Sequence, residues 1–470
     1  MAEPLWTSDE IARATGGKLS GAPFAATGVS IDTRTIEPGD LFVALAGVRD
    51  GHEFVEQAMA KGAVGVLASQ TVSAPAVMVT DTLEALEKLG VAARGRTPQA
   101  RRGAVTGSVG KTSVTQAIMA GLGLAGRAHS SVKSYNNHIG VPLTLARMPR
   151  DTERAVFEIG MNHADEIRPL ARMVSPQVVV ITTVGPVHTE NFPDGEEGVA
   201  RAKAEVFQGL QPGGVAVLNA DNAWFDLLKA EALKAGAEVR TFGTKEGADA
   251  RLIDFQGAPG YAAVQARFHG KGLDFPILQT GMHWGLNAMA VLLMLEALDV
   301  DLGEGLAALG SFEPLEGRGA EAAVHLPGGP FTLIDESYNA NPISMASAIA
   351  TLGARKVGSG KIGGRRIVAL TDMLELGDDA PRYHAALAEP LAEANVDLVF
   401  CAGPLMKSLW DALPATRRGG YAETAADLAP QVSRAAEPGD LVMVKGSNGS
   451  KAGAVAAALR ALDPGPRELG

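Results

Sequence analysis

Short apolar runs alternate with helical patterns along most of the chain. Such runs occur at 154–160 (RAVFEIG), 176–184 (PQVVVITTV), 213–219 (GGVAVLN) and 238–243 (EVRTFG), with helix-period segments between them. Apolar runs bounded by turn residues are typical of buried strands in a parallel sheet. The alternation predicts an α/β fold, in which ligands bind at the carboxyl ends of the strands.

The N-terminal part, 1–98, predicts a small α/β domain of its own. An alternating strand pattern lies around residue 30, and a buried strand, LFVAL, follows the turn Pro-Gly-Asp. Ser30, Thr33 and Arg34 lie beside these strands and are candidates for binding a phosphate. From composition alone, a solvated turn with a surface arginine explains the same residues and is favoured.

The pattern changes after residue 248. YAAVQARFHG and GLDFPILQ predict antiparallel strands appended to the central sheet, and FEPLEGRGA at 312–320 reads as a linker. Beyond it, four strand patterns alternate with helices and predict a Rossmann-like domain. That domain has no G-x-G-x-x-G after its first strand, so we do not expect it to bind a dinucleotide. The predicted domains are 1–98, 99–317 and 318–470.

The strongest chemical signal is a glycine-rich turn between a strand and a helix at 102–122. Its glycines let backbone N–H groups surround an anion at the positive end of the helix. The lysine suits β- and γ-phosphates, and the following threonine hydroxyl suits Mg²⁺. Val105 occupies the position where the common P-loop has its first glycine, so the loop is a T-G-x-x-G-K-T variant. The predicted nucleotide-binding residues are Gly107, Ser108, Val109, Gly110, Lys111, Thr112 and Ser113.

Three further residues of the central region follow or flank its strands. Glu158 ends an apolar run, where a carboxylate could hold Mg²⁺ directly or through water. His188 follows the VVVITTVGP strand, and Lys203 lies on the AKAEVF helix. A histidine after a strand is usually structural and a helix lysine is usually solvated, whereas an unpaired buried carboxylate is costly.

Composition narrows the function classes. A chain of 470 residues is too long for one core, and its formal net charge of −11 disfavours nonspecific nucleic-acid binding. Its single cysteine, Cys401, lies in an apolar run and cannot form an intrachain disulfide. We see no signal-peptide pattern, and the longest apolar run, AMAVLLML at 288–295, is too short to span a bilayer. We therefore expect a cytoplasmic protein.

The ordered motifs resemble those of the Mur ligase family across essentially the whole chain. They are VSIDTRTIEPGDLFVALAG, TGSVGKTS, SYNNHIGVPLTL, EIGMNHADEI, AKAEVF, G-x-H-x-x-x-N, EGRG, DESYNANPISM, TDMLELG and KGS. The resemblance implies an N-terminal UDP-substrate domain, a central P-loop ATPase domain with a mainly parallel sheet, and a Rossmann-like C-terminal domain. It also implies ATP-dependent amide-bond formation through an acyl phosphate in peptidoglycan precursor synthesis.

The resemblance also implies roles for individual residues. Thr112 and Glu158 would hold one Mg²⁺, and His188 with a carbamylated Lys203 would hold a second. Lys111 joins Glu158, His188 and Lys203 as the catalytic set. The implied ATP contacts outside the P-loop are Asn287, Arg318 and Asp335. The implied contacts to the UDP-substrate are Ser30, Thr33 and Arg34 for the uridine diphosphate, and Asn136, Asn137, Asn162 and His163 for the muramyl peptide. Trp284 follows His283 where these ligases often carry asparagine.

The implied partners are two small molecules, a UDP-N-acetylmuramoyl-tripeptide and D-alanyl-D-alanine, and we expect a monomer. A sister ligase is the first alternative, but ligases that add diaminopimelate carry a D-N-P-R-type motif that this chain lacks. A folylpolyglutamate synthase-like amide ligase is the second. A P-loop switch would need the guanine-reading N-K-x-D, which is also missing. Glu158, His188 and Lys203 together argue against a nucleotide-gated binding module without chemistry.

Overall fold

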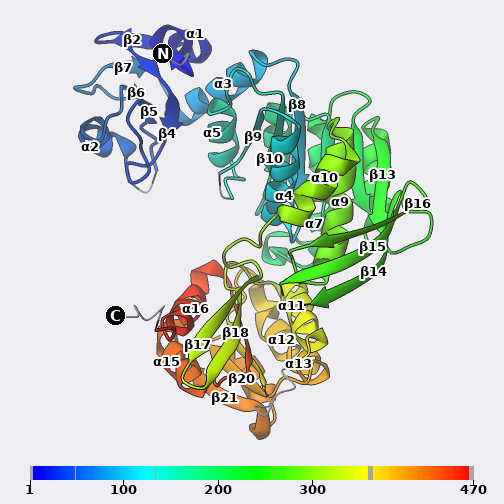
Figure 1. Ribbon diagram of the computed structural model, residues 1–470. Helices are drawn as coiled ribbons and strands as arrows, with labels where there is room; N and C mark the ends of the chain where they lie inside the picture. The colour runs from blue at the N-terminus through cyan, green and yellow to red at the C-terminus, as the bar shows by residue number, and fades with distance from the viewer. Residues whose placement is uncertain (1–3, 48, 133, 259, 358–363, 465–470) are drawn as a thin grey trace, which may run out of the picture.

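The computed structural model describes residues 4–47, 49–132, 134–258, 260–357 and 364–464. Figure 1 shows three bodies in chain order: one in blue, one in cyan and green, and one in yellow to red below them. They are built around sheets of five, nine and six strands. The predicted α/β class with three domains is confirmed, while the bounds of the domains stay a prediction.

The N-terminal sheet has the order β2-β7-β6-β5-β4, with β2 antiparallel and the others parallel. Its strands are β2 (Lys18–Ser20), β4 (Gly28–Ser30), β5 (Asp40–Val43), β6 (Gly65–Ala68) and β7 (Ala76–Met78). A separate antiparallel pair joins β1 (Trp6–Thr7) to β3 (Ala25–Ala26). The helices are α1 (Ser8–Thr15), α2 (Val55–Ala60) and α3 (Thr82–Gly95).

Local sequence explains where these helices begin and end. Thr7 and Glu10 form a reciprocal capping box at the start of α1, and Gly16 ends that helix with φ +72°. The carboxylate of Asp81 accepts hydrogen bonds from two backbone N–H groups at the start of α3.

The central sheet has the order β16-β15-β14-β13-β12-β11-β8-β10-β9. Strands β8 to β14 are parallel, and β15 and β16 extend the sheet as an antiparallel meander. The strands are β8 (Arg101–Thr106), β9 (Ala128–Ser130), β10 (Arg154–Glu158), β11 (Val178–Ile181), β12 (Val215–Asn219), β13 (Glu238–Gly243), β14 (Ala250–Ala258), β15 (Tyr261–Phe268) and β16 (Lys271–Ile277). The predicted antiparallel strands are therefore β15 and β16.

Helices cover both faces of the central sheet. Alternate residues along β10 show this division, because Val156 packs in the core beneath α4 and α9, whereas Phe157 packs with α5 to α8. The helices are α4 (Lys111–Ala125), α5 (Gly140–Ala146), α6 (Ile167–Val174), α7 (Gly195–Ala204), α8 (Phe225–Lys234), α9 (His283–Ala297) and α10 (Leu302–Ser311). The carboxyl ends of β8, β10 and β11 meet at one edge, where the candidate residues lie.

The C-terminal sheet has the order β17-β18-β22-β19-β20-β21, with only the edge strand β17 antiparallel among the described strands. The strands are β17 (Ala320–Leu326), β18 (Gly329–Glu336), β19 (Arg366–Thr371), β20 (Leu398–Ala402), β21 (Arg418–Ala422) and β22 (Leu441–Lys445). The helices are α11 (Pro342–Ala354), α12 (Ala380–Ala385), α13 (Ala388–Glu393), α14 (Lys407–Ala412), α15 (Ala425–Ala435) and α16 (Gly453–Arg460). Cys401 is buried in β20, as expected, and burial raises its pKa to about 12.

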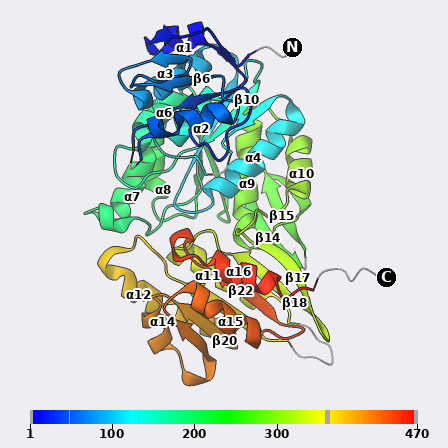
Figure 2. The ribbon, with the colours of Figure 1, turned by 90° about the vertical axis from the view of Figure 1, so that its left-hand side faces the viewer.

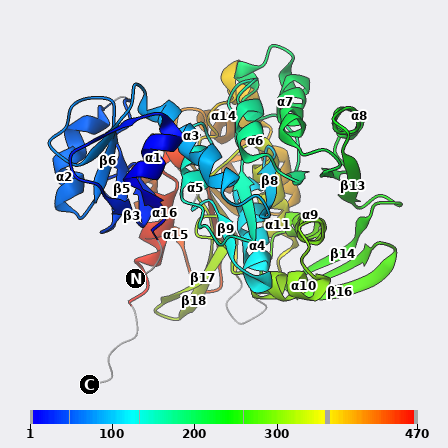
Figure 3. The same ribbon diagram turned by 90° about the horizontal axis from the view of Figure 1, so that it is seen from above.

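The N-terminal domain shares a hydrophobic core with the central domain. Leu86 and Leu89 of α3 are fully buried in one cluster with Leu143 and Ala146 of α5. Figure 3 shows α3 and α5 between the blue domain and the rest of the central domain. The two domains are therefore joined by packing as well as by the chain.

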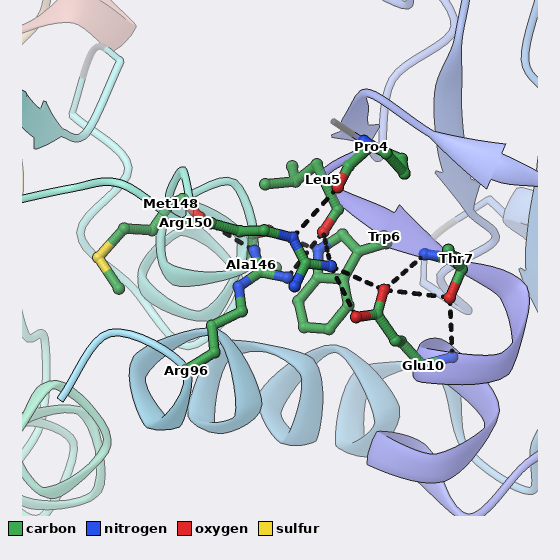
Figure 4. Close-up of polar contacts among 9 residues, drawn as sticks. All are labelled: Pro4, Leu5, Trp6, Thr7, Glu10, Arg96, Ala146, Met148 and Arg150. Carbon is green, nitrogen blue, oxygen red and sulfur yellow. Dashed lines mark hydrogen bonds and ion pairs between the residues drawn. The ribbon is translucent and has the colours of Figure 1, made fainter. Parts of the chain in front are cut away.

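Polar groups reinforce this junction (Figure 4). The indole Nε1 of Trp6 donates to the carbonyl of Ala146 over 2.8 Å, and the guanidinium of Arg96 lies 3.9 Å from the Trp6 ring centroid. Arg150 donates to both carboxylate oxygens of Glu10 at 2.7 and 2.8 Å. Burial alone would raise the pKa of Glu10, but the N–H of Thr7 and the guanidinium of Arg150 outweigh it and lower that pKa.

Within the described ranges, no helix combines the length and the apolar character that crossing a membrane requires.

We predict that Trp6→Phe lowers the stability of the protein more than Trp410→Phe. The first change removes a buried hydrogen bond between two domains, a loss of about 1–3 kcal/mol. Trp410 packs against Tyr421 and lies 5.3 Å from the guanidinium of Arg418. Its indole forms no hydrogen bond with the described residues, so its replacement alters ring contacts without removing a hydrogen bond. Thermal unfolding followed by calorimetry compares the two variants, and an equal or larger shift for Trp410→Phe would contradict the role of the Trp6 bond.

Candidate active site

The loop between β8 and α4 depends on two glycines with positive φ. Gly107 has φ +149° and Gly110 has φ +85°, and the packing around Gly107 leaves no room for a Cβ. The hydroxyl of Ser108 donates to the carbonyl of Gly185 over 3.2 Å, which ties the loop to the chain beyond β11. No side chain caps α4, so its first N–H groups remain available to an anion.

A cavity of about 360 Å³ lies in front of this loop, between the central and C-terminal domains. Figure 2 shows the C-terminal domain packed beneath the central one. The predicted P-loop residues Ser108, Val109, Gly110, Lys111, Thr112 and Ser113 line one wall of it. The opposite wall includes Glu336, Tyr338, Asn339, Asn341 and Lys445 from the C-terminal domain. The volume is in the range of small-molecule sites.

Lys111 holds a positive charge at the end of the P-loop. Its Nζ donates to the carbonyl of Gly107 over 2.8 Å. Burial lowers the pKa of Lys111; the nearby carboxylate of Glu158 opposes this, Arg318 lowers the pKa further, and Glu375 raises it. A cation placed there is suited to bind β- and γ-phosphates.

Glu158 has one carboxylate oxygen that nothing satisfies. The residue ends β10 and is 1% exposed. Asn136 Nδ2 donates to Oε1 over 2.7 Å, while Oε2 has no hydrogen-bond partner among the described residues. Since an unpaired buried carboxylate oxygen is costly and Mg²⁺ prefers oxygen ligands, this geometry fits a Mg²⁺ site. The Thr112 hydroxyl lines the same cavity.

Arg318 from the predicted linker reaches the P-loop. Its guanidinium donates to Thr112 Oγ1 over 3.2 Å and to Ser134 Oγ over 3.4 Å. It lies over the ring of Tyr338, 4.1 Å from the centroid. The structure thus brings Arg318 to the start of α4, as a phosphate contact between domains requires.

Lys203 is buried on α7 without a counter-ion. It is 2% exposed, and in the described part of the chain no hydrogen bond or ion pair engages its amino group. Burial lowers the pKa of Lys203 far below its ordinary value, and the charge of Lys111 lowers it further. A neutral amine is the form that reacts with CO₂ to give a carbamate, so this environment fits the modification that the resemblance implies.

His188 contacts the C-terminal domain. Its Nδ1 lies 2.8 Å from Glu375 Oε2, and the contact with His188 lowers the pKa of Glu375. Across the described residues, no three His, Cys, Asp or Glu side chains are grouped as a ready metal site. A second metal site at His188 and Lys203 would therefore depend on the carbamate.

Glu336 and Lys445 are site residues that the sequence reasoning did not name. Lys445 is almost fully buried, and its Nζ donates to Glu336 Oε2 over 3.3 Å and to the carbonyl of Asn339 over 3.0 Å. Glu336 is the last residue of β18 and Lys445 the last of β22, at the edge of the C-terminal sheet that faces the cavity. They lie in the DESYNANP and KGS motifs, in which the resemblance implied a role for Asp335 only.

The other predicted ATP contacts occupy different surroundings. Asn287 lines the cavity close to Gly110. Asp335 lines a neighbouring cleft that shares Thr112 and Arg318 with the cavity, and its Oδ2 accepts a hydrogen bond from Arg460 at 2.5 Å. Trp284 is 3% exposed and packs against Phe312.

The predicted UDP-substrate residues are dispersed over two domains. Arg34 is exposed and pairs with Asp32, the hydroxyl of Thr33 donates to Gln57, and Ser30 is buried. None of the N-terminal three lines the nucleotide cavity as the described residues define it.

Of the four residues predicted to contact the muramyl peptide, Asn136 lines the cavity in front of the P-loop. Asn136 holds Glu158, as described above, and Asn137 Oδ1 accepts from backbone N–H groups at the start of α5. Glu166 accepts from the backbone of Asn162 and contacts the ring of His163.

Comparisons with known protein families agree with this architecture. Residues 25–94 match the "Mur ligase family, catalytic domain", 105–295 match the "Mur ligase middle domain", and 323–448 match the "Mur ligase, glutamate ligase domain". The fold and the interdomain P-loop site are those of a Mur ligase.

The relatives specify the branch of that family. A UDP-N-acetylmuramoyl-tripeptide–D-alanyl-D-alanine ligase from Bacillus subtilis is 34% identical over 468 residues, covering 95% of this chain and 96% of the relative. The chain belongs to this family of D-alanyl-D-alanine-adding ligases. A crystal structure of MurF from Acinetobacter baumannii superimposes with a TM-score of 0.85 at 26% identity, covering 98% and 99% of the two chains. A MurF ligase from Thermotoga maritima in complex with ADP shares the fold, with a TM-score of 0.77 at 22% identity and coverage of 93% and 97%.

We predict that Glu158→Gln abolishes Mg²⁺-dependent ATP turnover without lowering the melting temperature. The change removes an anionic oxygen that has no protein partner, so it removes no hydrogen bond of the fold. Phosphate release and calorimetry measure the two effects.

Glu205→Gln is the matched control, because this buried glutamate accepts hydrogen bonds from the backbone N–H groups of Asp165 and Arg168. That variant should lose about 1–3 kcal/mol of stability and retain turnover below its melting temperature. The opposite pattern, with Glu158→Gln active but unstable, would make Glu158 a structural residue.

Proposed function

We propose that this chain is an ATP-dependent ligase that joins D-alanyl-D-alanine to a UDP-N-acetylmuramoyl-tripeptide, giving ADP and phosphate in peptidoglycan precursor synthesis. The single observation that carries the chemistry is the interdomain cavity. There Lys111 and the unpaired oxygen of Glu158 face residues of the C-terminal domain. Family membership and the relatives' names support the choice of substrates.

The proposed reaction has two steps. A carboxylate oxygen of the tripeptide attacks the γ-phosphorus of ATP; the bond to the β–γ bridging oxygen breaks, and ADP leaves with that electron pair. The amine of D-alanyl-D-alanine then attacks the acyl carbon, the bond from that carbon to the phosphate oxygen breaks, and the amine loses a proton. The product amide, ADP and phosphate balance the reactants.

The chain's own residues counter the charge that these steps concentrate. The P-loop N–H groups and Lys111 bind the phosphates, and Arg318 extends the positive surface from the domain linker. Thr112 and Glu158 would hold one Mg²⁺, which neutralises phosphate charge when bound. The C-terminal wall of the cavity excludes water, which protects the acyl phosphate from hydrolysis.

A second Mg²⁺ would be held by His188 and a carbamylated Lys203. Carbamylation converts a buried amine into an anionic oxygen ligand. The carbamate would also be attracted by the charge of Lys111, which disfavours a protonated Lys203. The lowered pKa of Lys203 and its lack of a counter-ion support this proposal.

The remaining assignments follow the resemblance. Asn287, Arg318 and Asp335 would contact ATP, and Glu336 and Lys445 join them by their position in the cavity. The UDP-substrate would contact Ser30, Thr33, Arg34, Asn136, Asn137, Asn162 and His163. These roles divide the chain into the proposed domains 1–98, 99–317 and 318–470. We further propose that the enzyme is a cytoplasmic monomer that uses small-molecule substrates and no nucleic acid.

The proposal predicts phosphate release that requires ATP, the UDP-tripeptide and D-alanyl-D-alanine together, and its loss in a folded Lys111→Ala variant. A coupled phosphate assay measures this, and the omission of each substrate is the control. The sister-ligase alternative is tested by supplying a UDP-dipeptide and, as the amino acid to be added, diaminopimelate or lysine. The folylpolyglutamate synthase alternative is tested by supplying a folate and glutamate. Turnover with either replacement, or near-normal turnover by Lys111→Ala, would defeat the proposal.

We also predict that Lys203→Ala loses most activity and that Lys203→Arg fails to replace it, because a guanidinium cannot become an anionic ligand. Formate or acetate should restore part of the alanine variant's rate by filling the vacated position. Lys234→Ala, at an exposed lysine of α8, is the control and should behave as the unsubstituted enzyme. A ¹³C NMR signal from labelled bicarbonate should appear in the unsubstituted enzyme and vanish in both Lys203 variants. Full activity of Lys203→Arg would end the carbamate proposal.

A further inference from the structure

A loop of the C-terminal domain brings a carboxylate to His188 of the central domain. The loop lies in the TDMLELG motif and comprises residues 372–376, between β19 and the next short helix. Glu375 Oε2 lies 2.8 Å from His188 Nδ1. The distance suits a hydrogen bond but the direction does not, since Nδ1 lacks a well-directed partner.

The backbone on both sides of this contact takes a conformation that side chains rarely adopt. His188 has φ +55° and Glu375 has φ +63°. Left-handed non-glycine residues cost free energy and are concentrated at functional sites. Two such residues therefore meet across a domain boundary.

The backbones also approach closely beside the pair. A Cβ on Gly377, at φ +58°, would lie 3.0 Å from the Cβ of Glu190. These residues belong to the short helices η4 (Gly377–Asp379) and η2 (Thr189–Asn191), one from each domain.

Hydrogen bonds with buried polar groups hold the loop that carries Glu375 in place. His384 is fully buried, and its Nε2 accepts a hydrogen bond from the N–H of Met373 at 3.0 Å. Asp372 is also buried and accepts from the N–H of Met406 at 2.8 Å. The N–H of Leu374 donates to the hydroxyl of Ser447 over 3.1 Å. The C-terminal domain thus holds the backbone before Glu375 in place, while the Glu375 side chain itself is 56% exposed.

We propose that Glu375 is a positioning residue for His188, supplied by the C-terminal domain only when that domain is docked on the P-loop domain. Accepting the Nδ1–H of His188 fixes the ring tautomer and leaves Nε2 as the nitrogen able to bind a metal. The docking of the C-terminal domain thereby completes the ligand set. This inference rests on the proposed role of His188 in the ligase reaction.

The alternative is that Glu375 blocks His188 and must leave before catalysis. The two ideas predict opposite effects of Glu375→Gln, which keeps the shape of the side chain and removes its charge. Positioning predicts weaker metal binding and slower turnover, whereas blocking predicts tighter metal binding and faster turnover.

The test uses Glu375→Gln, with Asp378→Asn as the matched control. Asp378 is exposed and lies three residues further along, in η4. Mn²⁺ binding to the full chain with ADP and the UDP-tripeptide is measured by electron paramagnetic resonance. We expect Glu375→Gln to lower the affinity for one of the two Mn²⁺ ions about 10–100-fold, which is the range for residues that orient metal ligands. Asp378→Asn should leave the affinity for both ions unchanged.

A second readout requires no metal. The ¹⁵N shifts of the His188 imidazole, assigned with a His188→Gln spectrum, should report the Nδ1–H tautomer in the unsubstituted enzyme and a mixture in Glu375→Gln. In turnover, Glu375→Gln should lower kcat with little change in the KM for ATP. In a His188→Ala background it should have no further effect.

The outcomes separate this inference from the proposed function. If Glu375→Gln binds both Mn²⁺ ions as tightly as the unsubstituted enzyme does, and the His188 tautomer is unchanged, only the proposed role of Glu375 is overturned. One Mn²⁺ in the unsubstituted enzyme would overturn the metal role of His188 and this inference with it. Tighter Mn²⁺ binding and faster turnover in Glu375→Gln would make the carboxylate a block. Absence of ligase turnover in the unsubstituted enzyme would instead refute the proposed function.

Discussion

Lys111 must carry a positive charge in a buried site, and burial favours the uncharged amine. Burial lowers its pKa, and only carboxylates from other segments, Glu158 of β10 and Glu375 of the C-terminal domain, act to retain the proton. The P-loop glycines, the end of β10 and the docked C-terminal domain are therefore parts of one electrostatic arrangement. The unpaired oxygen of Glu158, and the burial of Lys203 near the charge of Lys111 without a counter-ion among the described residues, suit an arrangement that phosphate and metal charges complete.

The arrangement requires that three domains keep their relative positions. The N-terminal domain is held to α5 by a shared core and by the Trp6, Arg96 and Arg150 contacts. The C-terminal domain meets the P-loop domain through polar contacts, such as that of Arg318 with Thr112. Polar contacts of this kind can open and reform more easily than a hydrophobic core. We infer that substrate-linked movement is concentrated at the C-terminal domain.

Much of the fold was predictable because its signals are local. The parallel strands are short apolar runs, and the run EVRTFG became β13 with the same bounds, 238–243. β14, β17 and β21 were not predicted. Half-exposed or small residues dominate them, as in AEAAVHL and RGGYA, so they lack a continuous apolar run. Their strand conformation depends on pairing with neighbours that are fixed by tertiary structure.

Part of the candidate site could also be predicted from the sequence. The P-loop and Glu158 could be identified because each lies beside a strand with a clear pattern. Three site residues come from the C-terminal domain: Glu336, Lys445 and Glu375. Hydrophobic periodicity predicts helices and strands, but it does not show which residues meet across a domain boundary. The burial of Lys203 was also not predicted, because a lysine on a helix is usually solvated and the AKAEVF segment does not show that this one is covered.

The core shared by α3 and α5 has a consequence for anyone who divides this enzyme into pieces. A fragment ending at residue 98 would carry α3 without the partner surface formed by Leu143 and Ala146, and would expose Leu86 and Leu89 to water. Each leucine newly exposed forfeits roughly 1.5–3 kcal/mol. An N-terminal domain transplanted between relatives would need its matching α5 surface. The structural unit is therefore the small sheet together with α3 and α5, and not the sheet alone.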